Sequence, residues 1–149
     1  MKILIISDSH GNIANLNHVL GFAKKINVGA VIHCGDWNTL EAVETVLSFG
    51  IPLYSVIGNA DIADNIKDKF KESLEVELGG RKIGITHKPS NIKKYFVDKK
   101  LDIIFCGHYH SKDEGVFENM KTARPAAIIN GNNFAVYNTA SGTIEFVNE

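Results

Sequence analysis

The side chains best suited to chemistry are Asp, Asn and His residues that fall into five short motifs. Seven of them are candidate metal ligands: Asp8, His10, Asp36, Asn59, His87, His108 and His110. Imidazole and carboxylate groups together suit Zn, Mn, Fe or Ni. Seven ligands are too many for one tetrahedral ion but fit two ions that share a carboxylate. Two ions about 3.5–4 Å apart form the usual clamp for in-line displacement at phosphorus.

Each motif follows a short, apolar, strand-like segment. These segments are residues 2–7, 30–34, 52–57, 82–86 and 102–106. Ligands of open α/β sheets bind at the carboxyl ends of the strands, so this placement predicts one common site. Asp8 and His10 lie two residues apart, as do His108 and His110, and on extended chain each pair projects to one side. The same alternation predicts that Tyr109 points away from the metals and packs.

The first half of the chain alternates strand and helix signals. Residues 12–24 and 40–47 place apolar side chains at helical spacing, and Thr39 is a candidate N-cap for the second helix. A β-α-β-α-β order predicts parallel strands joined by right-handed crossovers.

The second half has a different pattern. Gly79-Gly80 predicts a hairpin between residues 73–78 and 82–86, and Ser90 is a candidate cap for a helix over 90–100. Further strand-like segments cover residues 116–117, 127–129, 134–139 and 143–147. We therefore expect the C-terminal part to be mostly antiparallel, and we expect an α/β fold with two face-to-face sheets and helices outside.

Composition sets wider bounds. The chain has 149 residues, 44% of them apolar and 22% charged, which predicts one domain over residues 1–149. The formal net charge of −1 argues against a general nucleic-acid-binding surface. No apolar run is long enough to predict a membrane span. Two cysteines, Cys34 and Cys106, form no dense disulfide framework, so we expect a cytoplasmic protein.

In their order and residue types, the five motifs resemble those of the calcineurin-like metallophosphoesterases, in particular the small phosphodiesterase branch without a cap. The resemblance runs from Ile3 to His110. It implies a four-layer α/β/β/α sandwich of two mixed sheets flanked by helices. It also implies that one ion is held by Asp8, His10 and His110, that the second is held by Asn59, His87 and His108, and that Asp36 bridges them.

The family's chemistry implies a phosphodiester substrate and a hydroxide nucleophile that bridges the two ions. Asn59, His108 and Asp36 would be the catalytic residues. We expect Mn²⁺ as the metal, with Ni²⁺, Fe²⁺ or Zn²⁺ as alternatives, since these ligands accept all four. Small members of the family often associate, so a homo-oligomer is left open.

The sequence departs from the family pattern after Gly58-Asn59. Many family phosphomonoesterases place a His there as proton donor to the leaving group, whereas this chain has Ala60. This difference favours diesters with good leaving groups. Lys88 and Asp61 are candidate replacements for the missing acid. Three alternatives stay open: a phosphomonoesterase, a pyrophosphatase, or a scaffold that binds metal without catalysis.

Several residues near the motifs have structural interpretations. We expect His33 to be buried and hydrogen-bonded or to support the ligands, and His18 to face solvent. We expect Cys34 and Cys106 to be small side chains that pack in the buried core. Asp61 is read as a helix cap, a salt-bridge partner or a support for the ligands. We expect the lysines at 93, 94, 99 and 100 to form a solvent-exposed face of the predicted helix.

Overall fold

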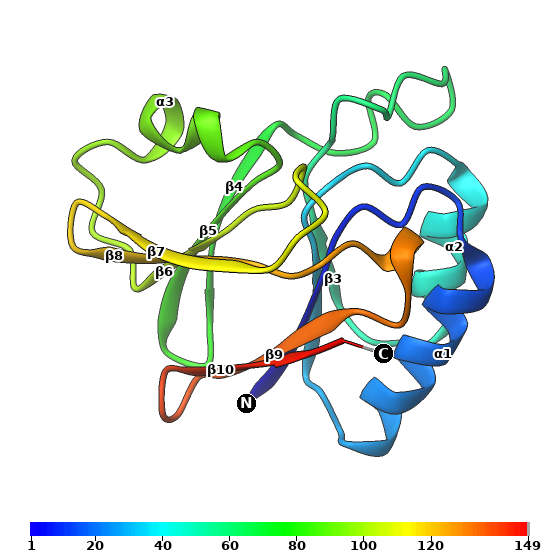
Figure 1. Cartoon of the computed structure of the whole chain (residues 1–149), viewed down its shortest axis with the longest axis horizontal. Coiled ribbons are helices and arrows are strands. Elements are labelled where there is room, and N and C mark those ends of the chain that lie inside the picture. Colours follow the sequence, from blue (N-terminus) through cyan, green and yellow to red (C-terminus); the bar gives the residue numbers. More distant parts are fainter. Residues whose placement is uncertain (149) are drawn as a thin grey trace.

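The computed structural model describes residues 1–148, and within them two five-stranded sheets pack face to face with helices on their outer sides (Figure 1). The first sheet has the order β10-β9-β1-β2-β3. Its strands are β1 (Lys2–Ile6), β2 (Ala30–His33), β3 (Leu53–Ser55), β9 (Phe134–Asn138) and β10 (Thr143–Val147). Strands β1, β2 and β3 are parallel, β9 pairs antiparallel with β1, and β10 pairs antiparallel with β9. Two helices, α1 (Ile13–Lys25) and α2 (Leu40–Ser48), connect the parallel strands, as the β-α-β-α-β pattern predicts.

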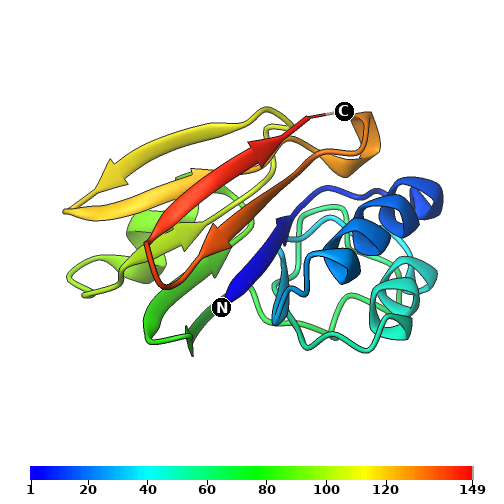
Figure 2. The same ribbon diagram turned by 90° about the horizontal axis from the view of Figure 1, so that it is seen from below.

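The second sheet has the order β4-β5-β6-β8-β7. Its strands are β4 (Ser73–Leu78), β5 (Arg81–Thr86), β6 (Ile103–Phe105), β7 (Asp113–Phe117) and β8 (Met120–Arg124). The three central strands β5, β6 and β8 are parallel, whereas the edge strands β4 and β7 are antiparallel. A short 3₁₀ helix, η1 (Pro89–Asn91), and α3 (Ile92–Phe96) cover its outer face. Figure 2 shows the two sheets from a second direction, with α1 and α2 on one side only.

Three apolar layers separate these elements. Ile3 and Ile5 of β1 face the second sheet, while Leu4 and Ile6 of the same strand face α1 and α2. A smaller cluster joins α3 to the second sheet. Because both faces of β1 are buried, its sequence reads as a continuous apolar run instead of an alternation. The observed layers confirm the α/β/β/α sandwich.

Both long helices begin at side-chain caps. Thr39 Oγ1 accepts a hydrogen bond from Ala42 N at 3.2 Å, as predicted for the start of α2. Asn12 Oδ1 accepts one from Asn15 N at 3.0 Å at the start of α1. The caps satisfy backbone N–H groups that have no partner within the helix. They also fix where the preceding loops, with Asp8, His10 and Asp36, must end.

The predicted helix over 90–100 is shorter than expected. Ser90 is not a helix cap but lies inside η1, which begins at Pro89, and α3 ends at Phe96. Asp98 then adopts a φ of 60°, a left-handed conformation that cannot continue a helix. After this turn the chain continues into β6.

The predicted strand over 127–129 is wrong, and one strand was missed. Residues Ile128–Asn130 form a 3₁₀ helix, η2, since their backbone donors bond to loops: Ile128 N to Ser7 O and Ile129 N to Asp8 O. The missed strand is β8, Met120–Arg124, where only Met120 and Ala123 are buried. Two inward residues at this spacing do not make a period-2 pattern.

Candidate metal centre

The loops that carry the motifs meet at one end of the sandwich. Asp8 and His10 follow β1, Asp36 follows β2, and Asn59 lies beyond β3. His87 follows β5, and the loop after β6 supplies His108 and His110. Hydrogen bonds tie the two sheets' loops together; for example, His108 N donates to the Asp8 carboxylate at Oδ2, at 3.0 Å. All seven predicted ligands therefore lie in loops at the carboxyl ends of parallel strands.

The first group contains Asp8, His10 and His110, whose ligand atoms lie within 4.8 Å of one another. His10 Nε2 is 3.3 Å from His110 Nε2. Asp8 Oδ1 is 3.5 Å from His110 Nε2 and 3.9 Å from His10 Nε2. Three ligand atoms at these separations surround a space of the size that one cation fills.

The second group contains Asp36, His87 and His108, again with ligand atoms within 4.8 Å of one another. His87 Nε2 is 3.2 Å from Asp36 Oδ2. Asn59 joins this group through its Oδ1, which is 3.1 Å from His108 Nδ1. The amide is thus placed beside the imidazole that the family resemblance assigns to the same ion.

Asp36 connects the two groups. Its Oδ2 lies 3.6 Å from His10 Nε2 in one group and 3.2 Å from His87 Nε2 in the other. The other oxygen, Oδ1, accepts a hydrogen bond from Ala60 N at 2.8 Å. One carboxylate oxygen is therefore fixed by backbone, and the second is directed between the groups, where a shared ligand would stand.

The residues present fit divalent cations. Among residues 1–148, Asp8 Oδ1 and His87 Nε2 are buried side-chain atoms without a hydrogen-bond partner. Buried polar atoms are normally paired, and an orphaned one costs about 1–3 kcal/mol. Both atoms point into the centre, and both are metal-ligand types. A pair of cations would satisfy them.

The histidines are oriented by their outer ring nitrogens. His87 Nδ1 lies 2.7 Å from Cys34 O, an acceptor, so Nδ1 carries the hydrogen and Nε2 is free to coordinate. His10 Nδ1 lies 3.0 Å from Asn38 Oδ1 and is oriented in the same way. Such contacts fix the tautomer that a metal ligand requires.

Charge inside the centre shifts three pKa values. Burial raises the pKa of Asp36, but the adjacent His87, the Ala60 N–H and the charge of His10 together lower it to about 2. Burial lowers the pKa of His87, yet the neighbouring Asp36 and Asp8 carboxylates raise it overall. Burial and the charges of His87 and Lys88 lower the pKa of His108. A metal that binds His87 therefore competes with a proton more strongly than it would at an isolated histidine.

The ligand loops are not extended, contrary to the sequence-based expectation. Asp8, His10, Asp36, His108 and His110 all have positive φ, between 43° and 80°. Side chains two residues apart therefore converge because the backbone turns in a left-handed conformation, not because a strand alternates. Non-glycine residues adopt this conformation at a cost and cluster at functional sites.

Two glycines permit the close approach of the loops. A Cβ on Gly58 would lie 2.2 Å from Asp36 Oδ1. A Cβ on Gly107 would lie 1.9 Å from Ser7 Oγ and 2.7 Å from Asp8 Oδ2. Any side chain at either position would displace a candidate ligand. The motif glycines are thus needed for packing against the carboxylates.

Asp61 supports the ligand loops. Its carboxylate accepts backbone hydrogen bonds from Asp36 N at 3.0 Å, Asn38 N at 2.8 Å and Gly58 N at 2.8 Å. Of the three interpretations from sequence, the supporting role is the one observed. The carboxylate is 3% exposed and fully engaged, so Asp61 is no proton donor to a leaving group.

His33 lies beneath the ligand loops. It is fully buried, its Nδ1 accepts a hydrogen bond from Gly35 N at 3.1 Å, and Nε2 lies 3.0 Å from Ser9 Oγ. Its ring stacks on Trp37 with the centroids 3.5 Å apart. Burial lowers the pKa of His33 well below its ordinary value. The prediction of a buried, hydrogen-bonded histidine is confirmed.

Other predictions for this region are also resolved. Cys34 and Cys106 are buried and unpaired, and His18 is exposed, as expected. Trp37, Ser9 and Asn38 were not singled out from sequence, although they contact His33 or His10. Their signal was proximity to the motifs, since each lies within two residues of a candidate ligand.

Tyr109 does not pack in the interior as predicted. Its side chain is 58% exposed, because the loop between His108 and His110 turns instead of continuing as a strand. Its ring lies 5.0 Å from that of His108, between centroids.

A cavity of about 160 Å³ opens beside the second group. Asn59 and His87 line it together with Lys88 and Asn91. Lys88 is half-buried, and its charge acts on His108. A cation of this chain therefore stands at the edge of the candidate centre.

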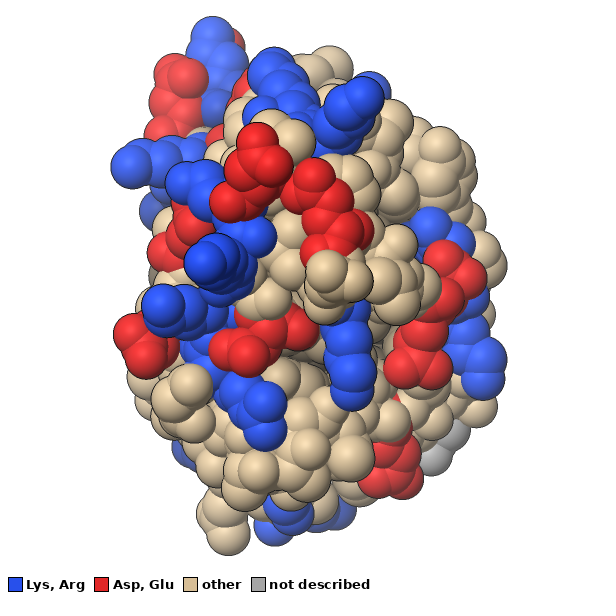
Figure 3. Space-filling view, turned by 90° about the vertical axis from the view of Figure 1, so that its left-hand side faces the viewer, with Lys and Arg blue, Asp and Glu red and all other residues tan. Residues whose placement is uncertain are grey.

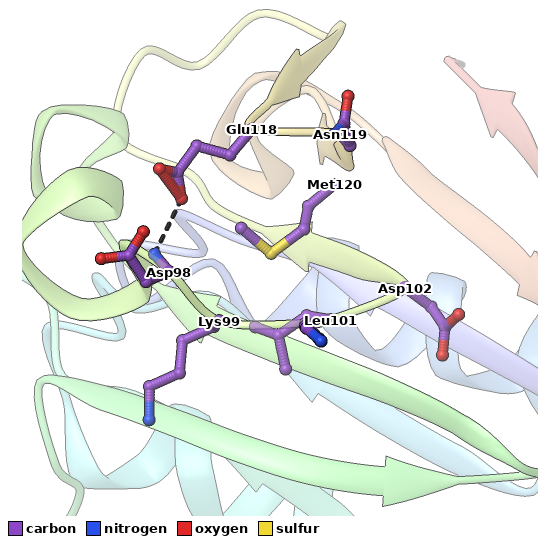
Figure 4. A pocket seen from close by; sticks show the side chains of 8 residues that line it. Asp98, Lys99, Leu101, Asp102, Glu118, Asn119 and Met120 are labelled. Carbon is purple, nitrogen blue, oxygen red and sulfur yellow. Dashed lines mark hydrogen bonds between the residues drawn. The ribbon is translucent and has the colours of Figure 1, made fainter.

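A second cavity, of about 620 Å³, lies between the turn after β7 and the segment that leads from α3 into β6. Glu118 Oε1 accepts a hydrogen bond from Asp98 N at 2.8 Å across it (Figure 4). None of the seven candidate ligands lines this cavity. We assign it no chemistry.

The face that carries α3 mixes charges of both signs. Lys93, Lys94, Lys99 and Lys100 are exposed, as predicted for a solvated face, and Lys99 Nζ pairs with Glu75 Oε2 at 3.3 Å. Figure 3 shows Lys and Arg interspersed with Asp and Glu on this side of the molecule. Every helix within residues 1–148 is too short or too polar to qualify as a membrane span.

The fold and the centre together define a metal-dependent phosphoesterase. Residues 1–130 match the calcineurin-like phosphoesterase superfamily domain, and the chain belongs to that family. This confirms the resemblance drawn from the five motifs. Members of the family act on phosphoesters.

Two curated relatives and one solved structure are similar along most of the chain. The probable metallophosphoesterase YsnB of Bacillus subtilis is 33% identical over 136 residues, 86% of this chain and 75% of the relative. Phosphodiesterase MJ0936 of Methanocaldococcus jannaschii is 29% identical over 132 residues, 80% of this chain and 78% of the relative. An archaeal phosphodiesterase structure superposes with a TM-score of 0.86 at 20% identity, over all of both chains.

Proposed function

We propose that the chain is a phosphodiesterase with a dinuclear metal centre. Asp8, His10 and His110 would hold one ion, and Asn59, His87 and His108 the other, with Asp36 shared. The observation that carries the proposal is the position of Asp36 Oδ2, 3.6 Å from His10 Nε2 and 3.2 Å from His87 Nε2. The name of the M. jannaschii relative supports the choice of diester.

When bound, two divalent ions supply Lewis acidity, which lowers the pKa of water to give the hydroxide nucleophile and offsets charge on the phosphoryl oxygens. The chain's residues set the field in which this happens. Asp8 and Asp36 leave two divalent ions with a surplus of positive charge. A phosphate ester is attracted to this centre although the whole protein carries −1.

Asn59 and His108 would act on the substrate side of the centre. Asn59 is exposed at the cavity, so its amide N–H groups can reach a phosphoryl oxygen while Oδ1 faces His108. Burial and the charges of His87 and Lys88 lower the pKa of His108, which favours the neutral imidazole that coordination requires. Both residues would stabilise charge that develops on the phosphoryl group.

The leaving group finds little acid assistance. Ala60 contributes its backbone N–H to Asp36 and has no proton to transfer, and the Asp61 carboxylate is engaged by three backbone donors. Lys88 lines the cavity and contributes a positive charge to it. A substrate whose alcohol leaves easily as an anion is therefore preferred, which favours activated diesters over monoesters of ordinary alcohols.

Hydrolysis by metal-stripped protein tests the proposal. Mn²⁺, Ni²⁺, Fe²⁺, Zn²⁺ and Mg²⁺ are added back singly, with bis-p-nitrophenyl phosphate as diester and p-nitrophenyl phosphate as monoester. We expect metal-restored cleavage of the diester, highest with Mn²⁺, and weak cleavage of the monoester. Equal or faster monoester cleavage would overturn the preference for diesters, and no cleavage of either despite bound metal would overturn the enzyme assignment.

Three further expectations belong to this proposal. We treat residues 1–149 as one catalytic domain. The two unpaired buried thiols of Cys34 and Cys106 fit a reducing compartment, which supports a cytoplasmic location. A homo-oligomer stays a prediction, which sedimentation of the purified chain would test.

A further inference from the structure

Tyr109 is an exposed aromatic side chain at the edge of the candidate metal centre. Three rings follow one another outward from it: His87 and His108 with centroids 5.2 Å apart, then His108 and Tyr109 with centroids 5.0 Å apart. His87 and His108 belong to the second ligand group. The phenol ring thus lies one ring beyond a candidate ligand, within reach of an ester arm of a phosphate bound there.

The Tyr109 ring is held in place by Arg124, at the end of β8. The guanidinium carbon lies 5.1 Å from the centroid of the Tyr109 ring. Arg124 is itself anchored, since Nε donates to Ser111 O at 2.6 Å and a terminal nitrogen to Ser111 Oγ at 3.4 Å. A cation over one part of the ring restricts its rotamers, so a stacking ligand loses less entropy on binding.

The surroundings of Tyr109 differ from those of an aromatic side chain that packs in a protein core. Tyr109 keeps 58% of its surface exposed while two contacts define its orientation. By contrast, the cavity beside Asn59 is lined by the polar side chains of Lys88 and Asn91. The two surroundings of the centre differ in chemistry, so the two ester arms of a diester meet different surfaces.

We propose that Tyr109 determines specificity by stacking on a planar aromatic ring carried by one ester arm of the substrate. The substrate class is a phosphodiester with an aryl or nucleobase arm, which share a π face. The inference rests on the proposed phosphodiesterase function. Stacking of bases on aromatic side chains is sequence-tolerant, so Tyr109 would select for a ring without selecting a particular base.

Competitive inhibition by two phosphonates measures the stacking directly. Phenylphosphonate and methylphosphonate share the anionic group and differ in the ring, and each Ki is measured against hydrolysis of bis-p-nitrophenyl phosphate. We expect the Mn²⁺-loaded wild type to bind phenylphosphonate about tenfold more tightly than methylphosphonate. Tyr109→Ala would abolish this ratio, whereas Tyr109→Phe, which keeps the ring, would retain it.

Three outcomes would overturn the inference. One is a wild type without preference for the phenyl ligand, and another is a Tyr109→Ala variant that keeps the preference. The third is an equal rise of both Ki values in Tyr109→Ala, because it would show a general disturbance of the centre. Thymidine 5′-phosphate, titrated in the same way, distinguishes a nucleobase arm from a simple aryl arm.

The failure of the inference is separable from that of the proposed function. Isothermal titration of both phosphonates into the Mn²⁺-loaded protein gives the same ratio of affinities without any turnover. A wild type that cleaves bis-p-nitrophenyl phosphate but shows no phenyl preference by titration would refute the role of Tyr109 alone. A wild type that prefers the phenyl ligand but cleaves no diester would refute the enzymatic proposal alone.

Discussion

The two ligand groups are built with different rigidity. In the group of Asp36, His87 and His108, the side chains of Asp36 and His87 are 3% and 4% exposed, and backbone atoms of Ala60 and Cys34 hold them. In the group of Asp8, His10 and His110, only Asp8 is buried, while the side chains of His10 and His110 are 18% and 39% exposed. The molecule thus combines one group with two buried ligands, beside the half-buried His108 and the exposed Asn59, and one group in which only Asp8 is buried.

This contrast between the two groups indicates the order in which metal ions would bind. Ligands held by backbone and burial lose little freedom when a metal binds, whereas an exposed histidine must be ordered at that moment. The Asp36 group should therefore bind metal more tightly, and the His110 group should bind the more exchangeable ion.

The largest effect is expected from Asp36→Asn, because Asp36 belongs to one group and lies 3.6 Å from His10 of the other. The substitution removes the shared negative charge but keeps the size of the side chain. We expect the kcat/KM for bis-p-nitrophenyl phosphate to fall about 10³-fold or more. Asp68→Asn, at an exposed position, is the matched control and should leave it unchanged. Comparable activity in the two variants would refute the shared role.

Next in size is the asymmetry between His87→Ala and His110→Ala. Loss of His87 removes a ligand that burial and Cys34 O hold in place, so metal affinity should fall more than about 100-fold. Loss of His110 should weaken one ion only and leave the tight ion bound. Calorimetric titration of Mn²⁺ gives both constants. If His110→Ala weakened the tighter ion more than His87→Ala did, the two groups would be ranked in the wrong order.

A smaller loss is expected from Asp61→Asn, which touches the centre only through backbone. The amide would replace a carboxylate oxygen by a donor that faces a backbone N–H of Asp36, Asn38 or Gly58. We expect activity to drop about 10–100-fold and excess Mn²⁺ to restore part of it. Asp64→Asn, whose side chain is 98% exposed, serves as control. An Asp61→Asn variant with wild-type activity at limiting Mn²⁺ would remove Asp61 from the support of the centre.

The smallest effect is a pH dependence of stability that arises from His33 beneath both groups. Burial lowers the pKa of His33 in the folded chain, while the unfolded chain takes up this proton below about pH 6.5. The free energy of unfolding should therefore fall as the pH drops from 6.5 through the folded pKa, by at most about 1.4 kcal/mol per pH unit.

Urea unfolding of metal-free protein at pH 7.5 and pH 5 measures this contribution. His33→Gln should unfold with a weaker dependence on pH than the wild type, because it removes the group whose folded pKa is depressed. Asn17→Gln, at an exposed position and without a titratable group, should keep the wild-type dependence. An unchanged dependence in His33→Gln would contradict a buried, neutral His33.

The sequence predicted the site better than the chain path through it. Polar motifs after apolar segments pointed to seven candidate ligands that the structure brings together at one end of the sandwich, since strand ends are read from hydrophobicity alone. The left-handed backbone conformation of Asp8 and His108 was not predicted, because the residue types alone do not indicate a positive φ at these positions. The same omission produced the wrong expectation for Tyr109.

The two halves of the fold were predictable to different degrees. The parallel strands β1 and β2 are buried on both faces and the edge strand β3 is partly buried, and all three give apolar runs, so their order and helices were found. The strand β8 buries only Met120 and Ala123, and its partner β7 is mostly exposed. Ile128 and Ile129 donate backbone hydrogen bonds to the ligand loops, a tertiary role that local patterns cannot separate from strand pairing.

Metal content and rate, measured on the same samples, test the dinuclear centre most directly. Metal-stripped wild type is titrated with Mn²⁺ while bound Mn²⁺ per chain and hydrolysis of bis-p-nitrophenyl phosphate are recorded. We predict two ions per chain, bound with unequal affinities, and a rate that rises with the second ion. Full activity at one ion per chain, or saturation at one ion in the wild type, would contradict a centre shared through Asp36.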